Sequence, residues 1–551
     1  MRPKRGLSPF LLLAAAVLLS HAPLLTAGYV QDDHLVVEAP RAGSPLTGSY
    51  WEGVRGGDAS LWRPVTLASY ALERAAASGA RPAVSHAVNL ALHAAVAIAL
   101  FSIASAAGLP APAAFLGALL FALTPAKSEA VANVVGRAEI LAALFSLLAV
   151  RLTLRGTRGA AWLAAGCVLL ACGSKETGFL APFLVGVAAL FASPSHRTRW
   201  GLVLPSILAV EIAAIARTLA LQAWFPRQRV PVLDNPLAAL SGIPYAATAL
   251  SLVSRAARIV LFPWGLAADY SGPSIPVETT ALALRPLLGA LLLAALVAAA
   301  LSGLARRRPV IALGGTLAAG SYLVTGNLLV PVGAVFAERF LYLPCAGLSL
   351  LAAAAAARLG RRGRAVLAGV AIAYAALVFA RSLDWKSDAS IFEATAKANP
   401  RSPRAALWLG TLAADRGDTV TARRELTRAA SLSPDFAAPH LHLGLLDARA
   451  GDHEAAVREF STAARLEPEW GIARLDLALA LHRKGDLAGA ERAVRHATIR
   501  EPDNARAWAE LGHLRYERGA LRSAIEPYRR AVALGRTDLS SRLAACEAAS
   551  P

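Results

Sequence analysis

Three stretches near the C-terminal end decide the fold: GDTVTARRELTRAASLSP at residues 417–434, GDHEAAVREFSTAARLEP at 451–468 and GDLAGAERAVRHATIREP at 485–502. Each stretch begins with glycine and ends with proline, and each starts 34 residues after the previous one. Other small residues follow the same period, namely Gly410, Gly444, Ala478 and Gly512, and Ala422, Ala456, Ala490 and Ala524. Pro400 precedes the series and Gly519 continues it. Such self-similarity indicates one structural unit repeated along the chain.

A period of 34 residues is typical of tetratricopeptide repeats, in which two helices cross at small residues and proline ends the second helix. We predict four repeats over 403–536, a half-repeat linker over 386–402, and a capping helix and tail over 537–551. Stacked repeats form a concave groove, which we expect to bind an extended peptide or a partner protein. The alternative is a spacer or a dimerisation element.

The region before the repeats is far more apolar. The 551-residue chain is 56% hydrophobic and only 17% charged, with a mean hydropathy of +0.48. Residues 1–381 contain a series of stretches long enough to cross a bilayer, which takes about 20 apolar residues. We expect eleven spans, beginning near Ser8, Val84, Ala111, Arg137, Ala160, Gly178, Trp200, Thr280, Pro309, Leu341 and Arg364. A further apolar stretch over 242–262 contains Arg255 and Arg258, and we interpret it as a re-entrant or interfacial helix.

Arginine clusters in the short loops orient these spans. The chain has a net charge of +19, and alternating spans place all the clusters on one side, at residues 151–158, 197–199, 306–308 and 361–364. Basic loops usually stay cytoplasmic, so we expect a cytoplasmic N-terminus, an external loop over 29–83, and repeats outside the cytoplasm. The Ala- and Arg-rich, Lys-poor composition is typical of bacteria, and we expect the chain to lie in the plasma (inner) membrane. Without a continuous basic face, nucleic acid is not expected as a partner.

The sequence contains no convincing motif for a metal site or a nucleotide-binding site. The four cysteines, Cys167, Cys172, Cys345 and Cys546, show no zinc or disulfide spacing. His86, Asn89 and His93 share one helix face but lack the spacing and carboxylate of a zinc site, so contacts between helices are the expected use. No phosphate-binding loop or dinucleotide fingerprint occurs in a convincing context.

Two adjacent carboxylates, Asp32 and Asp33, follow the first expected span on its external side. Carboxylates held close together at a membrane surface can raise one another's pKa. One of them could then act as a general base on an acceptor hydroxyl close to a lipid-borne donor. The alternative is a solvated interfacial turn without a catalytic role.

Ionisable residues at the ends of the spans form the second group of candidates: Lys127, Glu129, Arg137 and Glu139, then Lys175 and Glu176, then Glu338 and Arg339. Charges at membrane depth are costly and often mark a substrate path. The alternative is pairing that fixes helices together. We favour a functional role for Glu338 and Arg339, because an arginine suits a lipid phosphate, and a structural one for Glu139.

Taken in order, these pieces resemble the transmembrane and tetratricopeptide-repeat O-mannosyltransferases, multi-span enzymes that use lipid-phosphate sugars. The matching pieces are Asp32-Asp33, Trp62-Arg63-Pro64, Ser85 to Asn89 with His93, Ser128-Glu129 running to Arg137 and Glu139, Ser174-Lys175-Glu176, Pro263 to Asp269-Tyr270, and Pro331 to Glu338-Arg339 and Pro344. The sequence departs from the family pattern at Thr124 and Lys127, where histidines are common, and at Thr177.

The resemblance implies transfer of a sugar, mannose in this family, from a polyprenyl or dolichyl phosphate to a Ser/Thr hydroxyl of an exported protein, without a metal or other cofactor. It implies Asp32 or Asp33 as base, Arg339 as the leading phosphate ligand with Arg137 and Lys175 behind it, and further cavity residues at Arg63, His86, Asn89, Glu129, Glu338 and Asp269. Two other functions stay open. One is a lipid-glycan ligase acting on polysaccharide, and the other is a non-catalytic membrane scaffold that presents the repeats.

Overall fold

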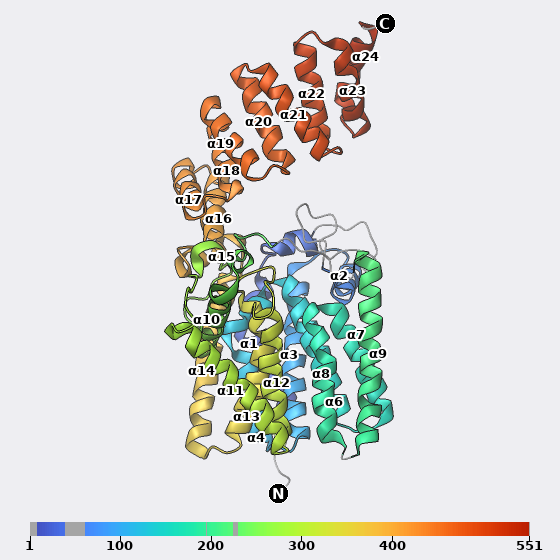
Figure 1. Cartoon of the computed structure of the whole chain (residues 1–551), viewed down its shortest axis with the longest axis vertical. Coiled ribbons are helices and arrows are strands. Elements are labelled where there is room, and N and C mark those ends of the chain that lie inside the picture. The colour runs from blue at the N-terminus through green and yellow to red at the C-terminus, as the bar shows by residue number, and fades with distance from the viewer. Residues whose placement is uncertain (1–7, 39–60, 194, 224–229, 550–551) are drawn as a thin grey trace. The chain divides into compact units, whose positions relative to one another are not determined.

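The computed structural model describes residues 8–38, 61–193, 195–223 and 230–549. Within these ranges the chain is all-α and contains no strand, which confirms the expected fold class. Two compact units divide the chain, at residues 1–399 and 400–551 (Figure 1). Each unit is described by itself below.

The first unit is a bundle of apolar helices (Figure 1). One helix lies in each expected span: α1 (Pro9–Ser20), α3 (Pro82–Ala106), α4 (Ala111–Leu123), α6 (Arg137–Thr153), α7 (Arg158–Ser174), α8 (Ala181–Ala192), α9 (His196–Leu221), α11 (Leu284–Ala305), α12 (Pro309–Thr325), α13 (Tyr342–Ala356) and α14 (Arg361–Asp384). Among the described residues, five helices are long and apolar enough to cross a membrane, or six if the bent pair at 111–132 is one span. The chain is therefore a membrane protein, while the count of eleven spans stays a prediction.

Short helical turns adjoin the apolar helices where the polar candidates lie, and among the described residues one pair of helices, at 111–132, is bent enough to be a broken span. After α4 the chain bends by 54° into η3 (Pro125–Lys127) and α5 (Ser128–Ala132), and η4 (Val134–Gly136) then leads into α6. Similarly, η5 (Glu176–Leu180) separates α7 from α8, and η8 (Glu338–Leu341) precedes α13. A Cβ on Gly136 would lie 2.3 Å from Ala130 O, and one on Gly178 would lie 2.1 Å from Ala171 O, so both turns depend on glycine. Broken backbone at membrane depth is tolerated where it is buried or lines a cavity.

The segment over 242–262 forms a helix, α10 (Gly242–Leu261), that packs against α11. The close contact passes through Gly289, where a Cβ would lie 1.9 Å from Leu250 O. Helix α10 is not among the five candidate spans. Its assignment as an interfacial or re-entrant helix stays a prediction.

Shorter elements occupy the connections of the first unit. They are η1 (Ala22–Thr26), η2 (His34–Glu38), α2 (Pro64–Ala76), η6 (Pro236–Ala239), η7 (Gly272–Ser274) and α15 (Asp388–Ala398). The expected external loop 29–83 therefore contains η2 and α2, while its residues 39–60 lie outside the described ranges. Helix α15 lies within the expected half-repeat linker 386–402. It groups with the first unit, which ends at residue 399.

The second unit contains four helix pairs at the predicted repeats: α16 (Pro403–Asp415) with α17 (Thr419–Leu432), α18 (Ala437–Arg449) with α19 (His453–Leu466), α20 (Gly471–Lys484) with α21 (Leu487–Arg500), and α22 (Ala505–Glu517) with α23 (Leu521–Ala533). The glycines that follow the first helix of each pair have positive φ, between 73° and 90°. Glycine is favoured in this left-handed region. A capping segment follows, with η9 (Thr537–Leu539) and α24 (Ser540–Ala548), and residues 550–551 of the predicted tail lie outside the described ranges.

Local chemistry explains the helix starts and crossings of the repeats. Asp418, Asp452 and Asp486 recur every 34 residues, and each accepts a hydrogen bond from a backbone N–H in the first turn of the second helix. Such N-caps typically stabilise a helix by about 1 kcal/mol. At the crossing of α18 and α19, a Cβ on Gly444 would lie 2.7 Å from the Phe460 ring, so the small residues of the period allow the helices to approach closely.

Candidate active site

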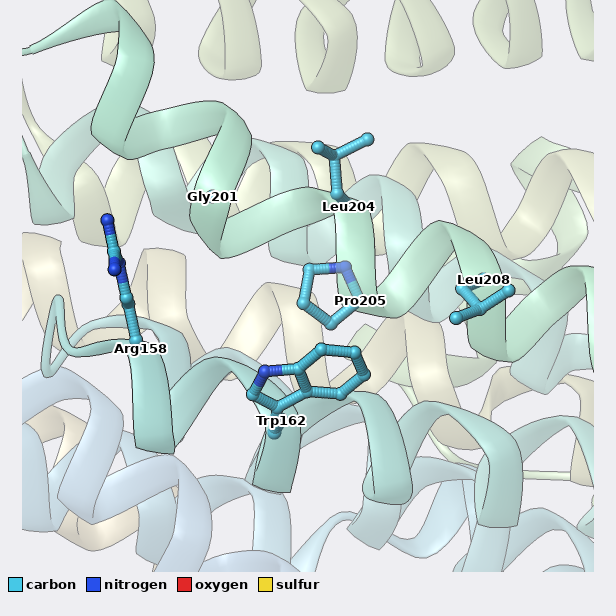
Figure 2. Close-up of a pocket in the computed structure, with 6 residues that line it drawn as sticks. All are labelled: Arg158, Trp162, Gly201, Leu204, Pro205 and Leu208. Atoms are coloured by element: carbon cyan, nitrogen blue, oxygen red, sulfur yellow. The ribbon is translucent and has the colours of Figure 1, made fainter.

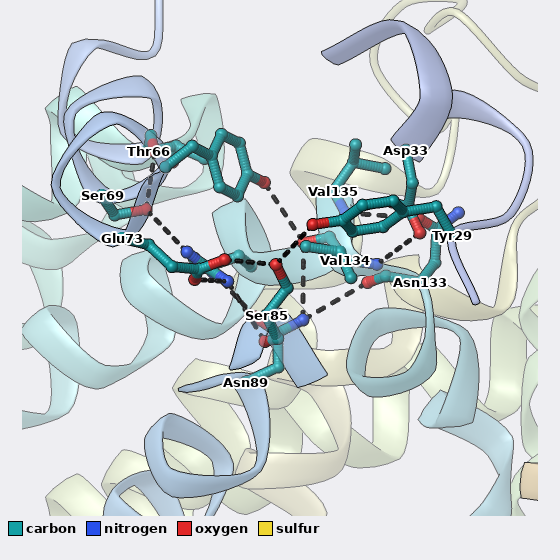
Figure 3. Close-up of polar contacts among 12 residues, drawn as sticks. Tyr29, Asp33, Thr66, Ser69, Glu73, Ser85, Asn89, Asn133, Val134 and Val135 are labelled. Atoms are coloured by element: carbon teal, nitrogen blue, oxygen red, sulfur yellow. Dashed lines mark hydrogen bonds and ion pairs between the residues drawn. The ribbon is translucent and has the colours of Figure 1, made fainter. Parts of the chain in front are cut away.

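The two adjacent acidic residues that follow α1, Asp32 and Asp33, lie in different surroundings. Asp33 is fully buried, and its carboxylate accepts hydrogen bonds from the backbone N–H groups of Val135 (2.8 Å) and Val134 (3.2 Å) (Figure 3). It also accepts one from the Val30 N–H (3.3 Å). Asp32 is half-buried. The residue before them, Gln31, has a φ of 51°, in the left-handed region. This turn therefore directs the two carboxylates into different environments.

The pKa of Asp33 is raised to about 7, mainly because burial disfavours its charged form. The three backbone N–H groups act in the opposite direction and stabilise the carboxylate, while the neighbouring charge of Asp32 raises the pKa further. Asp33 thus joins η4 to the segment that follows α1. Its burial and its three bonds to backbone favour a structural role for Asp33.

Asp32 lies within electrostatic range of Arg339, whose guanidinium it attracts. Arg339 follows Glu338 in η8, and its strongest partner is Glu129 on α5. Glu129 accepts from the Arg339 backbone N–H at 2.9 Å and forms an ion pair with the Arg339 side chain. The Glu129 side chain is 2% exposed but that of Arg339 is 35% exposed. Glu129 therefore holds one side of an arginine that is still open to a ligand.

Two further cations gather near Arg339. Lys175 forms an ion pair with Glu139 and is repelled by the charges of Arg63 and Arg339. Arg63 makes a two-point contact with Glu176, through Nε at 3.2 Å and Nη2 at 2.8 Å. The side chains of Lys175 and Arg63 are 10% and 13% exposed. Each cation is thus paired, and Arg339 is the most accessible of the three.

The third expected phosphate ligand, Arg137, belongs to a different cluster, formed with Glu73, Ser85 and Asn89, which Figure 3 labels. Its side chain is 0% exposed and forms an ion pair with Glu73 at 2.6 Å. It also donates to Asn89 Oδ1 at 2.8 Å and to the Ser85 carbonyl at 3.2 Å, and its guanidinium lies 4.7 Å from the Tyr70 ring centre. This arrangement favours a structural role for Arg137, in which it joins α6 to α2 and α3.

Sequence reasoning missed Glu73, the carboxylate partner of Arg137. Helix α2, on which Glu73 lies, buries Thr66, Leu67 and Tyr70 on one face. The spacing of these residues could have predicted an amphipathic helix lying against the bundle. The ion pair itself could not have been predicted, because it depends on the tertiary contact between α2 and α6.

The histidines of α3 have separate partners. His86 is buried and lies 3.1 Å from the Gly28 carbonyl. His93 lies deeper, 2.7 Å from the Tyr342 hydroxyl and 3.2 Å from the Lys127 ammonium. Among the described residues, no three His, Cys, Asp or Glu side chains are close enough together to hold a metal ion. The contacts of His86 and His93 thus join α3 to neighbouring segments.

The two remaining expected cavity residues shape the loop that precedes α11. The Glu338 carboxylate is fully buried and accepts from the Ala267 N–H at 2.6 Å and the Tyr270 hydroxyl at 2.9 Å. Asp269 accepts from the backbone and hydroxyl of Ser271. Both side chains therefore fix the segment 267–271 beside η8.

A separate groove of about 440 Å³ lies between α7 and α9, lined by Arg158, Trp162, Gly201, Leu204, Pro205 and Leu208 (Figure 2). Arg158 and Lys175 lie at opposite ends of the 17-residue helix α7, which places them roughly 25 Å apart. The groove is therefore distinct from the cluster around Arg339. Its exposed apolar side chains suit contact with lipid.

Comparisons with known proteins match a repeat family and several curated relatives. The tetratricopeptide repeat family matches residues 447–514. A protein O-mannosyl-transferase of Caenorhabditis elegans is 28% identical over 334 residues, which are 59% of this chain and 46% of the relative. One of Mus musculus is 27% identical over 419 residues, 66% of this chain and 56% of the relative. One of Homo sapiens is 26% identical over 426 residues, 69% of this chain and 45% of the relative.

Solved structures match a smaller part of the chain. A crystal structure of MamA is 21% identical with a TM-score of 0.25, covering 27% of this chain and 88% of that one. A structure of YrrB, described as a repeat protein with an unusual peptide-binding site, is 17% identical with a TM-score of 0.25, covering 30% of this chain and 83% of that one.

The chain spans about half the length of the curated relatives that it matches. These relatives confirm the resemblance recognised in the sequence. The chain is a membrane-embedded relative of the proteins named protein O-mannosyl-transferases, and it carries tetratricopeptide repeats in its C-terminal part.

Proposed function

We propose that this chain is a glycosyltransferase of the plasma (inner) membrane, which moves mannose from a polyprenyl or dolichyl phosphate carrier to a Ser/Thr hydroxyl of an exported protein. The observation that carries the proposal is that Asp32 lies within electrostatic range of Arg339. A half-buried carboxylate near a partly exposed guanidinium suits a reaction in which a proton leaves one substrate and a phosphate leaves the other. The names of the relatives support the same reaction class.

Asp32 acts as the general base in this proposal. The acceptor hydroxyl oxygen attacks the anomeric carbon of the sugar, and its proton passes to the Asp32 carboxylate. The bond between the anomeric carbon and the phosphate oxygen breaks, and the lipid phosphate leaves with the electron pair. General-base catalysis typically contributes about 10²–10⁴-fold to such a step. Asp33 does not take the proton and instead holds the turn.

Arg339 binds the phosphate of the carrier, before and after the bond breaks. A guanidinium offers several donors in a fixed plane, which suits two-point binding of a phosphate. Glu129 orients this plane, and the nearby charges of Lys175 and Arg63 add positive potential where the leaving group develops negative charge. The proposed reaction needs no metal ion, because these three cations can stabilise the leaving phosphate.

The repeats bind the acceptor polypeptide outside the cytoplasm. Concave grooves of stacked helix pairs are suited to extended peptides. In this proposal the repeats select the acceptor protein, while the membrane unit binds the donor and performs the transfer.

The test uses the purified full-length protein in lipid vesicles, with radiolabelled mannose on a lipid phosphate and exported proteins as acceptors. Label should enter protein, should do so equally in the presence of a chelator, and should be lost in Asp32→Asn. Label in polysaccharide instead would identify a lipid-glycan ligase. A lack of transfer to either acceptor, with the donor intact, would favour the scaffold.

A further inference from the structure

Asp388, the first residue of α15, contacts the external segment that carries the two carboxylates. Its Oδ1 accepts a hydrogen bond from the Gln31 backbone N–H at 2.8 Å, and its Oδ2 lies 3.1 Å from His34 Nε2. A backbone hydrogen bond lies beside these contacts, from Gly28 N–H to the Lys386 carbonyl at 3.0 Å. The segment before Asp32 is thus fastened to the start of α15 at several points.

The turn at Gln31 needs stabilising contacts because of its backbone conformation. Gln31 has a φ of 51°, a left-handed value that is uncommon for residues other than glycine. Such conformations persist where the surrounding structure holds them. Asp33 holds the turn from the bundle side through Val135, and Asp388 holds it at the Gln31 amide. Asp32 is the next residue after Gln31, so a rotation at Gln31 would change the direction of its carboxylate.

Helix α15 is itself firmly placed within the first unit. Its start is fixed by a capping box between Ser387 and Ser390. Further along, Thr395 accepts from the Ala268 N–H at 3.1 Å, and Asn399 donates to the Asp269 carbonyl at 2.9 Å. The Asp388 carboxylate is therefore presented from a rigid support, as a positioning group requires.

We propose that Asp388 is a positioning residue, which holds the Gln31 turn and thereby keeps Asp32 within electrostatic range of Arg339. The proposal does not place Asp388 in contact with substrate. It acts through the Gln31 amide and His34, from a helix far along the chain. Its effect on turnover rests on the proposed function, whereas its effect on the turn can be measured without any activity.

The first measurement is hydrogen–deuterium exchange of the segment 24–38 in the full-length protein. In Asp388→Ala the Gln31 amide loses its acceptor, and its exchange should become at least about tenfold faster, because protection follows the local opening equilibrium. Asp388→Asn keeps an acceptor oxygen for this amide and should retain most of the protection. Glu393→Ala removes one negative charge from an exposed position of the same helix and serves as the matched control, with wild-type exchange expected.

The second measurement is the transfer assay. A misplacement of about 1 Å can lower a rate by about 10²-fold, so Asp388→Ala should lower kcat by about 10–100-fold, with little change in KM for the lipid donor. Asp388→Asn should restore most of kcat.

Unchanged Gln31 exchange in Asp388→Ala would overturn the proposal, as would faster exchange with unchanged kcat. If Asp388→Ala does not fold, Asp388→Ser replaces it. Loss of Gln31 protection and of kcat in Asp388→Ser would support the proposal, and wild-type values of both would overturn it. If the wild-type protein transfers no sugar, the proposed function fails, and the exchange result alone decides whether Asp388 holds the turn.

Discussion

The Asp33 carboxylate accepts a 2.8 Å hydrogen bond from the backbone N–H of Val135. This bond joins the segment after α1 to η4, the short turn that leads into α6. Asp32, one residue earlier, lies instead near Arg339. Two carboxylates that are indistinguishable as a sequence pair thus differ in what surrounds them, and substitutions should separate their roles.

Asp32→Asn and Asp33→Asn should fail in different ways. Asp32→Asn should lower kcat by about 10²–10⁴-fold, because it removes the proposed base, and should leave the melting temperature nearly unchanged. Asp33→Asn places an NH₂ group where a carboxylate oxygen accepts from backbone amides. A buried donor without an acceptor costs about 1–3 kcal/mol, so this variant should melt lower. Transfer kinetics and thermal unfolding in detergent measure the two effects, and wild-type turnover in Asp32→Asn would remove it from the mechanism.

Arg339 should tolerate lysine poorly if it binds phosphate. Lysine keeps the charge but loses the planar set of donors, so Arg339→Lys should weaken donor affinity strongly with little loss of stability. Arg339→Leu should in addition lower stability by roughly 3 kcal/mol, because it leaves the buried Glu129 carboxylate without its cation. Donor titration and melting of both variants test this. Unchanged donor affinity in Arg339→Lys would shift the phosphate site to Lys175 and Arg63.

Arg137 should behave as a structural residue. Its side chain is buried against Glu73, Asn89 and Ser85. Removing one partner of a buried ion pair costs about 3–5 kcal/mol, so Arg137→Leu should lower the melting temperature strongly. Donor affinity of the protein that stays folded should be close to wild type. A stable Arg137→Leu variant with lost donor affinity would return Arg137 to the phosphate site. Lys397→Leu, at an exposed position of α15, is the control for loss of one positive charge.

Fold and site differ in how far the sequence predicts them. The apolar stretches predicted the position of each bundle helix, because a bilayer demands about 20 apolar residues for each crossing. The period of Gly417, Gly451 and Gly485 predicted the repeats, because only a repeated turn explains it. Which side chains pair with one another in the bundle could not be predicted in this way. The pairing of Arg137 with Glu73, and the separation of Asp32 from Asp33, depend on contacts between distant segments and on the conformation of Gln31.

His34 should make the external segment weakly sensitive to pH. Burial lowers its pKa, but the carboxylates of Glu38 and Asp388 raise it by more, so the net pKa lies above the ordinary value of 6.5. The charged form is therefore favoured by folding, and its contribution is fully present below pH 6.5 and is lost as pH rises through the folded pKa. The side chain is 42% exposed, so the effect should be below about 1 kcal/mol. The difference in melting temperature between wild type and His34→Gln should be larger at pH 6 than at pH 9, and an equal difference at both values would contradict it.

The orientation in the membrane gives the last prediction. The connection between α6 and α7 carries Arg155, and Arg158 begins α7, at the end of this helix opposite Lys175. In Figure 1 the α13–α14 connection lies at the lower end of the bundle, while α2 lies at the upper end. Basic loops favour the cytoplasmic side, so the end with Asp32 and Arg339 should face outward, where an exported acceptor is present.

A phosphatase that folds only outside the cytoplasm, fused after Ala549, should therefore be active. The same reporter inserted between Arg306 and Arg308, in the connection of α11 and α12, should be inactive and serves as the internal control. An active reporter at the second position and an inactive one at the first would reverse the orientation. The proposed base would then face the cytoplasm, and transfer to exported proteins would have to be abandoned.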